Sequence, residues 1–144
     1  MNWALPAVML AMSVMPSFAA DLEANKKTVL EFYEAGLNKK DFEAASKYFG
    51  PKYIQHNPGA PDGIEGLKGF IALRKEKFPS AKSEIKRAFT EGDYVILHVH
   101  GVREPGERGV AIVDIFRLEN GKIVEHWDVV QPIPEKTANS NGMF

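Results

Sequence analysis

A β-hairpin pattern near the end of the chain constrains the fold more than any other stretch. The segment from Val113 to Asp128 consists of two runs of strand-forming residues separated by Asn120-Gly121. An Asn-Gly pair between such runs is the strongest short-range signal of a tight hairpin turn. We therefore predict two antiparallel strands joined by this turn.

Three ionisable side chains interrupt these otherwise core-like strands: Asp114, His126 and Asp128. Burying a charged group on a strand face is costly unless that group is paired or used. Titratable groups in apolar surroundings are therefore candidates for a functional site. The hairpin is the first place in this chain to look for chemistry.

The register of the hairpin decides which way these groups point. A two-residue loop places Asp114 opposite Trp127, with His126 and Asp128 on the other face. A three-residue loop with a glycine bulge places Asp114 opposite His126, and Asp128 lies on the same face. A one-residue slip moves every side chain to the opposite face. We expect the bulged register, which gathers the ionisable groups on one face with Ile112, Phe116 and Val124 and sends Glu125 and Trp127 to the other.

Composition and charge narrow the class of protein. The 144 residues, 44% of them hydrophobic, suit one globular domain with a real core. A net charge of −1 gives no basis for a nucleic-acid partner or an anionic membrane surface. The absence of cysteine rules out disulfides and a thiolate nucleophile. Any zinc site would have to use histidine and carboxylate ligands.

The first 20 residues differ from the rest of the chain. Residues 1–20 carry no charged side chain, and an apolar run is followed by Pro16 and then by small residues. This pattern is typical of a secretory signal peptide, with cleavage after Ala19. The other interpretation is an uncleaved membrane-anchoring helix, for which the apolar run is short. We expect an exported, periplasmic or secreted protein.

Helical patterns come first in the mature chain. Residues 21–38 have a broad apolar face at helical spacing, with Asp21 as a plausible N-cap. Asp41 is expected to cap a second short helix, which Gly50-Pro51 ends. A short strand over residues 53–57 follows, and a third helix runs from about residue 64 to 78.

The remaining pattern is that of strands. Four are expected, over residues 83–90, 94–103, 109–118 and 122–131, and residues 135–144 form a flexible tail. This order gives an α+β fold in which three N-terminal helices wrap a curved, antiparallel or mixed β-sheet over residues 21–134. A curled sheet covered by helices encloses a conical cavity, which suits a small-molecule ligand.

Several motifs in this order resemble the SnoaL-like polyketide cyclases, a family within the nuclear transport factor two-like superfamily. They are Tyr53-Ile54-Gln55-His56-Asn57-Pro58, His98-Val99-His100 and the hairpin from Val113 to Asp128. The resemblance covers residues 22 to 134. It implies an intramolecular aldol condensation without a cofactor, with a cavity aspartate and histidine as acid and base. It also implies pairing of sheets back to back in a homodimer.

Residue by residue, the resemblance implies distinct roles. Asp128 matches the acid/base aspartate of the cyclases. Ketosteroid isomerase, a relative, has its oxyanion aspartic acid in a strand motif similar to Ile112-Val113-Asp114, and its oxyanion tyrosine is similar to Tyr33. The isomerase base is an aspartate where this chain has Asn57, which cannot act as a base. That difference argues against isomerase chemistry unless His56 takes the place of the aspartate as the base.

The predicted activity is therefore lyase, cyclase or isomerase chemistry on a small carbonyl compound, without a cofactor or metal. Asp128, His126, His56 and Asp114 are the candidate catalytic residues. The candidate substrate-binding residues are Tyr33, Asn57, His98, His100 and Phe116. Two alternatives remain open. One is a metal bound by His98 and His100 with His56 or His126, and the other is a non-catalytic protein that binds a small hydrophobic ligand or a partner.

Overall fold

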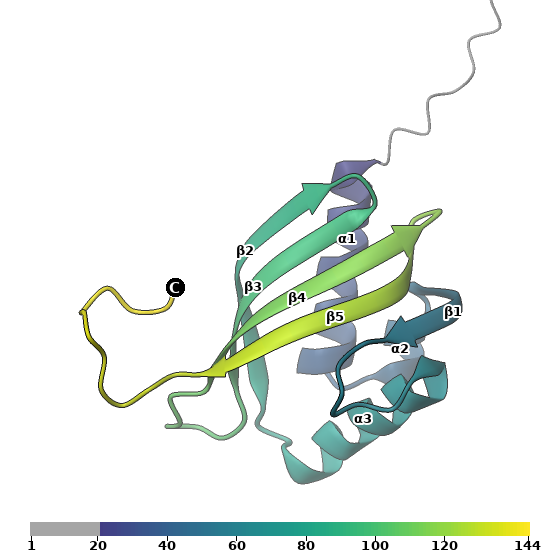
Figure 1. Ribbon diagram of the computed structural model, residues 1–144. Coiled ribbons are helices and arrows are strands. Elements are labelled where there is room, and N and C mark those ends of the chain that lie inside the picture. Colours follow the sequence, from purple (N-terminus) through teal and green to yellow (C-terminus); the bar gives the residue numbers. More distant parts are fainter. Residues whose placement is uncertain (1–20) are drawn as a thin grey trace, which may run out of the picture.

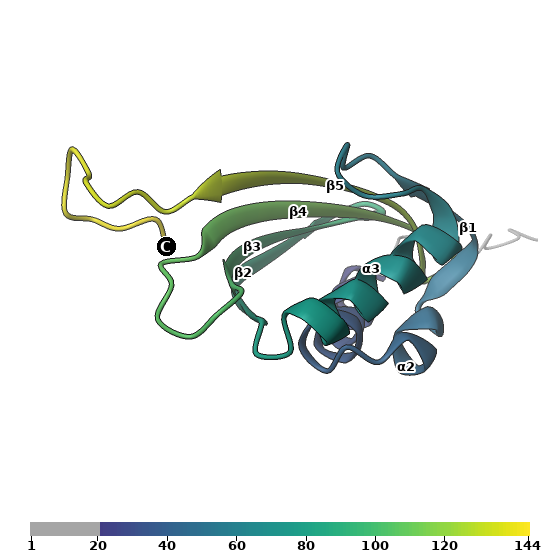
Figure 2. The ribbon, with the colours of Figure 1, turned by 90° about the horizontal axis from the view of Figure 1, so that it is seen from below.

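The computed structural model describes residues 21–144, so the predicted signal peptide lies outside the described residues. Helical elements come first and cover one side of a curved sheet (Figures 1 and 2). The helical elements are α1 (Leu22–Phe32), the π-helix η1 (Tyr33–Asn38), α2 (Phe42–Ser46) and α3 (Gly63–Lys77). The strands are β1 (Phe49–Gln55), β2 (Lys82–Glu91), β3 (Tyr94–Val102), β4 (Val110–Glu119) and β5 (Lys122–Pro132).

The five strands form one mixed sheet in the order β1-β5-β4-β3-β2. Strand β1 runs parallel to β5, and all other neighbours are antiparallel. The predicted α+β fold with a curved, mixed sheet is confirmed, and the sheet is not closed. Within residues 21–144, no helix has the length and apolarity needed to cross a membrane.

Both predicted aspartate caps are present. The carboxylate of Asp21 accepts a hydrogen bond from the Ala24 backbone N–H at 3.0 Å, and Asp41 does the same for Ala44 at 3.0 Å. Each cap satisfies an amide that the first helical turn leaves unpaired. The first helix continues without a break from Leu22 to Asn38, but its hydrogen-bond pattern changes from α to π at Tyr33, where η1 begins.

The stretch around Gly50-Pro51 differs from the prediction. The second helix ends at Ser46 and strand β1 already begins at Phe49, so Gly50 and Pro51 lie inside a strand instead of ending a helix. Proline is tolerated there because β1 is the edge strand, and its pairing with β5 is irregular between Phe49 and Ile54. The predicted strand over 53–57 is thus displaced toward the N-terminus.

The core lies between the helices and the concave face of the sheet (Figure 2). Val29 and Phe32 of α1 and Ile71 of α3 are buried against inward-facing residues such as Leu97 and Phe116. Burial of side chains of this size stabilises the fold by about 1.5–3 kcal/mol each. The helices do not fill the whole concave side, and the remaining space forms a cavity.

The hairpin has a two-residue loop with a bulge beside it. Asn120 and Gly121 have φ angles of 51° and 72°, as a tight primed turn requires, and Glu119 pairs with Lys122. Farther along, Leu118 pairs with Ile123 but Arg117 pairs with Glu125, which leaves one extra residue in β5.

This bulge fixes the register. Asp114 lies opposite Asp128, and Phe116 lies opposite His126. The expected partner of Asp114 was His126, so that detail of the prediction is wrong. The expected face is confirmed, since Asp114, His126 and Asp128 all line the concave side and Trp127 pairs with Ile115 on the other.

Candidate functional site

A cavity of about 120 Å³ lies between the concave face of the sheet, η1 and α3. Its wall is mainly apolar and includes Phe32, Leu37, Leu67, Phe70, Ile112 and Phe116. Polar side chains reach it from the hairpin, from β1 and the segment after it, and from η1 and α3. An apolar hollow with few convergent polar groups is the usual form of a small-molecule site.

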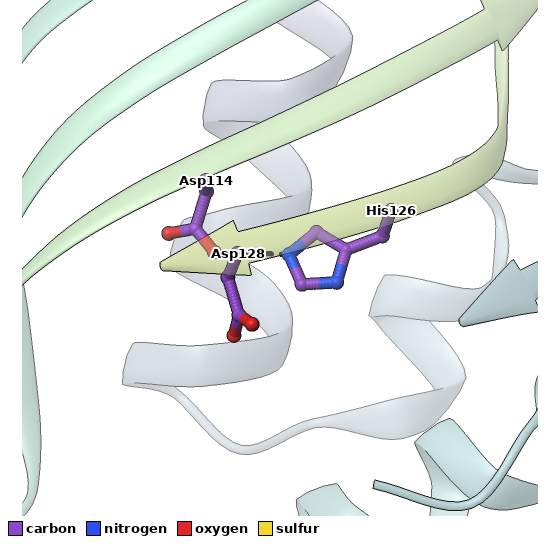
Figure 3. Close-up of side chains that lie close together, drawn as sticks. All are labelled: Asp114, His126 and Asp128. Atoms are coloured by element: carbon purple, nitrogen blue, oxygen red, sulfur yellow. Dashed lines mark hydrogen bonds and ion pairs between the residues drawn. The ribbon is translucent and has the colours of Figure 1, made fainter. Parts of the chain in front are cut away.

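Asp114 is the centre of the polar group. Its side chain extends from β4 toward His126 of β5 (Figure 3), and Asp114 is only 4% exposed. Carboxylate Oδ1 lies 2.9 Å from His126 Nε2. Carboxylate Oδ2 accepts a hydrogen bond from the Tyr33 hydroxyl at 2.6 Å. A buried carboxyl group with partners on both oxygens is well compensated for its loss of water.

Gln55 determines where His126 carries its protons. The side-chain oxygen of Gln55 lies 2.9 Å from His126 Nδ1 and accepts the Asn57 backbone N–H at 2.9 Å. The Asn57 N–H can only donate, so it fixes the orientation of the amide, and the Gln55 amide nitrogen donates to the Tyr53 hydroxyl at 2.9 Å. Because an amide oxygen can only accept, Nδ1 of His126 bears a proton.

It follows that His126 and Asp114 share one further proton between Nε2 and Oδ1. Either the imidazole is doubly protonated and faces a carboxylate, or a neutral imidazole accepts from a protonated carboxyl. Both arrangements have zero net charge. The pair is therefore a proton donor held inside an apolar wall.

Asp128 lies beside Asp114 and His126 (Figure 3), lines the same cavity and is half-buried. Its two oxygens each lie 2.7 Å from the side-chain nitrogen of Asn57. The Asn57 oxygen in turn accepts the Gly59 backbone N–H at 2.7 Å, which orients the amide. Asp128 thus presents a carboxylate that is positioned by one amide and still open toward the cavity.

The tyrosines of the site keep their protons. Burial and the nearby Asp114 raise the pKa of Tyr33 well above its ordinary value. Burial, followed by the charges of Asp114 and Asp128, also raises the pKa of Tyr53. Tyr33 is therefore a neutral hydroxyl donor at physiological pH.

Three of the predicted histidines lie away from the cavity. His56 stacks on Trp127 with ring centroids 4.6 Å apart, and its Nε2 lies 2.8 Å from a Glu125 oxygen, so it occupies the outer face. His98 and His100 of β3 also point outward, where both rings contact Phe144. Their geometry does not support the predicted roles in catalysis or substrate binding.

The remaining predicted residues meet in one place: Tyr33, Asn57, Asp114, Phe116, His126 and Asp128 all line the cavity. Sequence patterns do not single out Gln55, since a lone glutamine in a strand has no distinctive pattern. They do not single out Arg74 either, because a basic residue near Lys75 and Lys77 looks like part of a solvated helix face.

One combination of side chains could hold a metal. Asp114, His126 and Asp128 each offer a ligand atom, and these atoms lie within 4.8 Å of one another. A nitrogen and two carboxylate oxygens suit zinc or iron. Each of these atoms, however, already has a protein partner in Tyr33, Gln55 or Asn57 or within the trio itself.

Solved structures share this architecture. TsrD from Streptomyces laurentii is 23% identical, with a TM-score of 0.63 over 74% of this chain and 88% of TsrD. AclR from Streptomyces galilaeus is 22% identical, with a TM-score of 0.64 over 77% of this chain and 81% of AclR. An NTF2-like protein of unknown function from Cytophaga hutchinsonii is 28% identical, with a TM-score of 0.62 over 75% and 90% of the two chains.

These likenesses show an NTF2-like fold. No curated protein matches the chain. The sequence profile of the SnoaL-like polyketide cyclases does match, over residues 27–136, which include every polar group of the cavity described above. The chain belongs to the SnoaL-like polyketide cyclase family.

Proposed function

We propose that the protein is a cofactor-independent acid–base catalyst that acts on a small carbonyl compound, in an aldol-type cyclisation or a related lyase or isomerase reaction. The observation that carries this proposal is the pairing of two unlike proton-transfer groups at one end of an apolar cavity. The Asp114–His126 pair holds a proton, and Asp128 offers an open carboxylate.

In this proposal Asp128 is the base. Asn57 is its hydrogen-bond partner within the described residues, so lone pairs of the carboxylate remain free toward the cavity. Asp114 is the weaker candidate, because Tyr33 and His126 occupy both of its oxygens. The amide of Asn57 cannot take up a proton, and it serves to orient Asp128.

The reaction has two proton transfers. Asp128 removes a proton from the carbon next to a carbonyl group, and the C–H electron pair forms an enolate. The enolate carbon then attacks a second carbonyl carbon of the same molecule and forms a C–C bond. The oxygen of the attacked carbonyl becomes negatively charged and takes up the proton shared by His126 and Asp114. The proton that Asp128 removed later returns to the His126–Asp114 pair. Positioned groups of this kind accelerate proton transfer about 10²- to 10⁴-fold.

Tyr33 supports the acid and does not deliver the proton itself. Its hydroxyl donates to Asp114 at 2.6 Å and holds that carboxyl in place for His126. The raised pKa of Tyr33 keeps this donor protonated throughout the neutral range. Gln55 holds the imidazole of His126 in place from its other ring nitrogen, Nδ1.

The test is exchange of the α-proton of a carbonyl compound for solvent deuterium, followed by proton NMR. A panel of neutral ketones and oxo acids is used, because exchange reports the first step without knowledge of the natural product. The wild-type protein should accelerate exchange of at least one class. The Asp128→Asn variant should lose about 10²- to 10⁴-fold of this acceleration.

The matched control is Asp93→Asn, which makes the same change in the exposed β2–β3 turn. It should leave exchange unchanged. Exchange no faster than in buffer for the whole panel, or full activity of Asp128→Asn, would contradict the proposal. Ligand binding without exchange would instead support a non-catalytic pocket protein.

We also propose that two copies associate through the outer face of the sheet. No described helix covers that face (Figure 1). Val113 and Val129 lie directly opposite each other on β4 and β5 and are 39% and 67% exposed. A second copy of the same apolar surface is the natural partner in a two-fold dimer.

A further inference from the structure

The cavity contains a cation that the proposed reaction does not use. Arg74 extends from α3 and lines the same cavity as Asp114, His126 and Asp128. It is the only lysine or arginine among the described residues of the lining. It belongs to helix α3, whereas Asp114 belongs to β4, and His126 and Asp128 belong to β5.

The guanidinium of Arg74 lacks the partner that such a group requires. Within residues 21–144, its Nε is buried and has no hydrogen-bond partner, and no carboxylate forms an ion pair with it. The Phe70 ring lies near it, with its centroid 5.9 Å from the guanidinium carbon. A guanidinium nitrogen that is buried without a hydrogen-bond acceptor is costly, and arginine cannot escape the cost by losing its proton.

We propose that Arg74 binds a carboxylate of the substrate. The inference rests on the proposed function and narrows its substrate class to small oxo acids, with the carboxylate on the α3 wall and the reacting carbonyl near Asp128 and His126. The planar fork of a guanidinium matches a carboxylate with two parallel hydrogen bonds.

A carboxylate fits this cavity better than a phosphate. The cavity provides one arginine, and the carboxylate of Asp128 on the opposite wall disfavours additional negative charge. Because the Asp114–His126 pair is neutral overall, a singly charged carboxylate is repelled by Asp128 less than a doubly charged phosphate. The partly apolar wall, with Phe70 stacked near the guanidinium, suits the carbon skeleton of an oxo acid.

The test compares binding of benzoylformate with binding of its methyl ester by calorimetry. Both probes carry a ketone, but only the first carries a carboxylate. Neither has a hydrogen on the carbon next to the ketone, so binding is measured without enolate formation. The wild-type protein should bind the acid at least about tenfold more tightly than the ester.

Variants assign that preference to one side chain. Arg74→Gln should bind acid and ester equally, and Arg74→Lys should retain part of the preference because it keeps the charge but not the fork. The matched control is Lys75→Gln, one residue along α3 and exposed, which should retain the full preference. Unchanged affinity of Arg74→Gln for the ester shows that the cavity is intact.

A second readout uses the wild-type protein alone. The NMR signal of the Arg74 Nε–H group, identified by its absence in Arg74→Gln, should shift on addition of benzoylformate and not on addition of the ester. No acid preference in the wild type, including no binding of the acid at tens of millimolar, would overturn the proposal. So would a preference that persists in Arg74→Gln.

The proposed function and this inference fail separately. A clear preference for the acid without any α-proton exchange would refute the catalytic proposal and leave Arg74 as a carboxylate site in a binding protein. Exchange confined to neutral ketones, without an acid preference, would refute the assignment of Arg74 and leave the acid–base mechanism in place.

Discussion

The hydroxyl of Tyr33 and the carboxyl group of Asp114 are joined by a 2.6 Å hydrogen bond between helix η1 and strand β4. The two residues are 81 positions apart in the chain, and both are buried. This bond therefore links the helical layer to the sheet at the centre of the candidate site.

Tyr33→Phe removes that bond and leaves the ring in place. The free energy of unfolding should fall by about 1–3 kcal/mol, because a buried acceptor loses its donor. Urea unfolding with an unchanged m-value measures the loss. Tyr94→Phe, which alters an exposed tyrosine, is the control and should change the stability little. Equal stability of the wild type and Tyr33→Phe would show that the bond contributes nothing net.

The same tyrosine predicts a loss of stability at alkaline pH. Its pKa in the folded protein is raised above the ordinary 10.0, mainly by burial. Its contribution is complete below pH 10.0, and it is lost as the pH rises, because only the unfolded chain then releases the phenolic proton.

Urea unfolding between about pH 9 and 11 tests this dependence. The free energy of unfolding should decrease with pH in the wild type and less steeply in Tyr33→Phe. Tyr53, whose pKa is also raised, accounts for part of the remaining slope. Identical slopes in the two proteins would rule out Tyr33 as a source.

Gln55→Leu tests the orientation of His126. The wild-type imidazole should show a protonated Nδ1 by nitrogen NMR, because the Gln55 oxygen accepts from it. Without that acceptor the ring is free to reorient, and α-proton exchange should fall about 10- to 100-fold. Retention of both the protonation pattern and the exchange rate would remove Gln55 from the mechanism.

The acid–base mechanism makes a prediction about metals. Asp114, His126 and Asp128 could surround an ion, but Tyr33, Gln55 and Asn57 already hydrogen-bond to the three side chains. We therefore expect exchange activity to persist after treatment with a chelator, with well under one metal per chain by elemental analysis. Activity that follows stoichiometric metal content would replace the proposed mechanism.

The dimer is tested by Val129→Lys on the outer face. This side chain is 67% exposed in the single chain, so a lysine is harmless there but unfavourable in an apolar interface. Sedimentation should show a dimer for the wild type and a monomer for the variant. Leu73→Lys, an equally apolar-to-basic change on exposed α3, should remain dimeric. A monomeric wild type at micromolar concentration would contradict the proposal.

The sequence predicted much of the fold because local signals agreed with one another. Capping by Asp21 and Asp41, the Asn120-Gly121 turn and the alternation along the strands each appear in the structure where expected. The face that carries Asp114 was also predictable, since two-residue periodicity is a local property.

The register was not predictable, because its cause is tertiary. The extra residue that shifts β5 is Val124, and it packs where Gly50 of β1 leaves room: a Cβ on Gly50 would lie 2.9 Å from Val124 Cγ1. No sequence pattern within the hairpin predicts its contact with Gly50 of β1. The outward position of His56 and the cavity-lining position of Arg74 were not predicted for the same reason. Each depends on contacts with an element that is distant in the sequence.

The alignment of Asp114 with Asp128 across two bonded strands has an evolutionary consequence. One carboxylate cannot move relative to the other without breaking main-chain hydrogen bonds, so this wall of the cavity is fixed in shape. Helix α3 on the opposite side of the cavity is held by side-chain packing, so its position can change as its residues are replaced. Lineages that adopt new substrates on this scaffold should therefore vary α3 and conserve the hairpin.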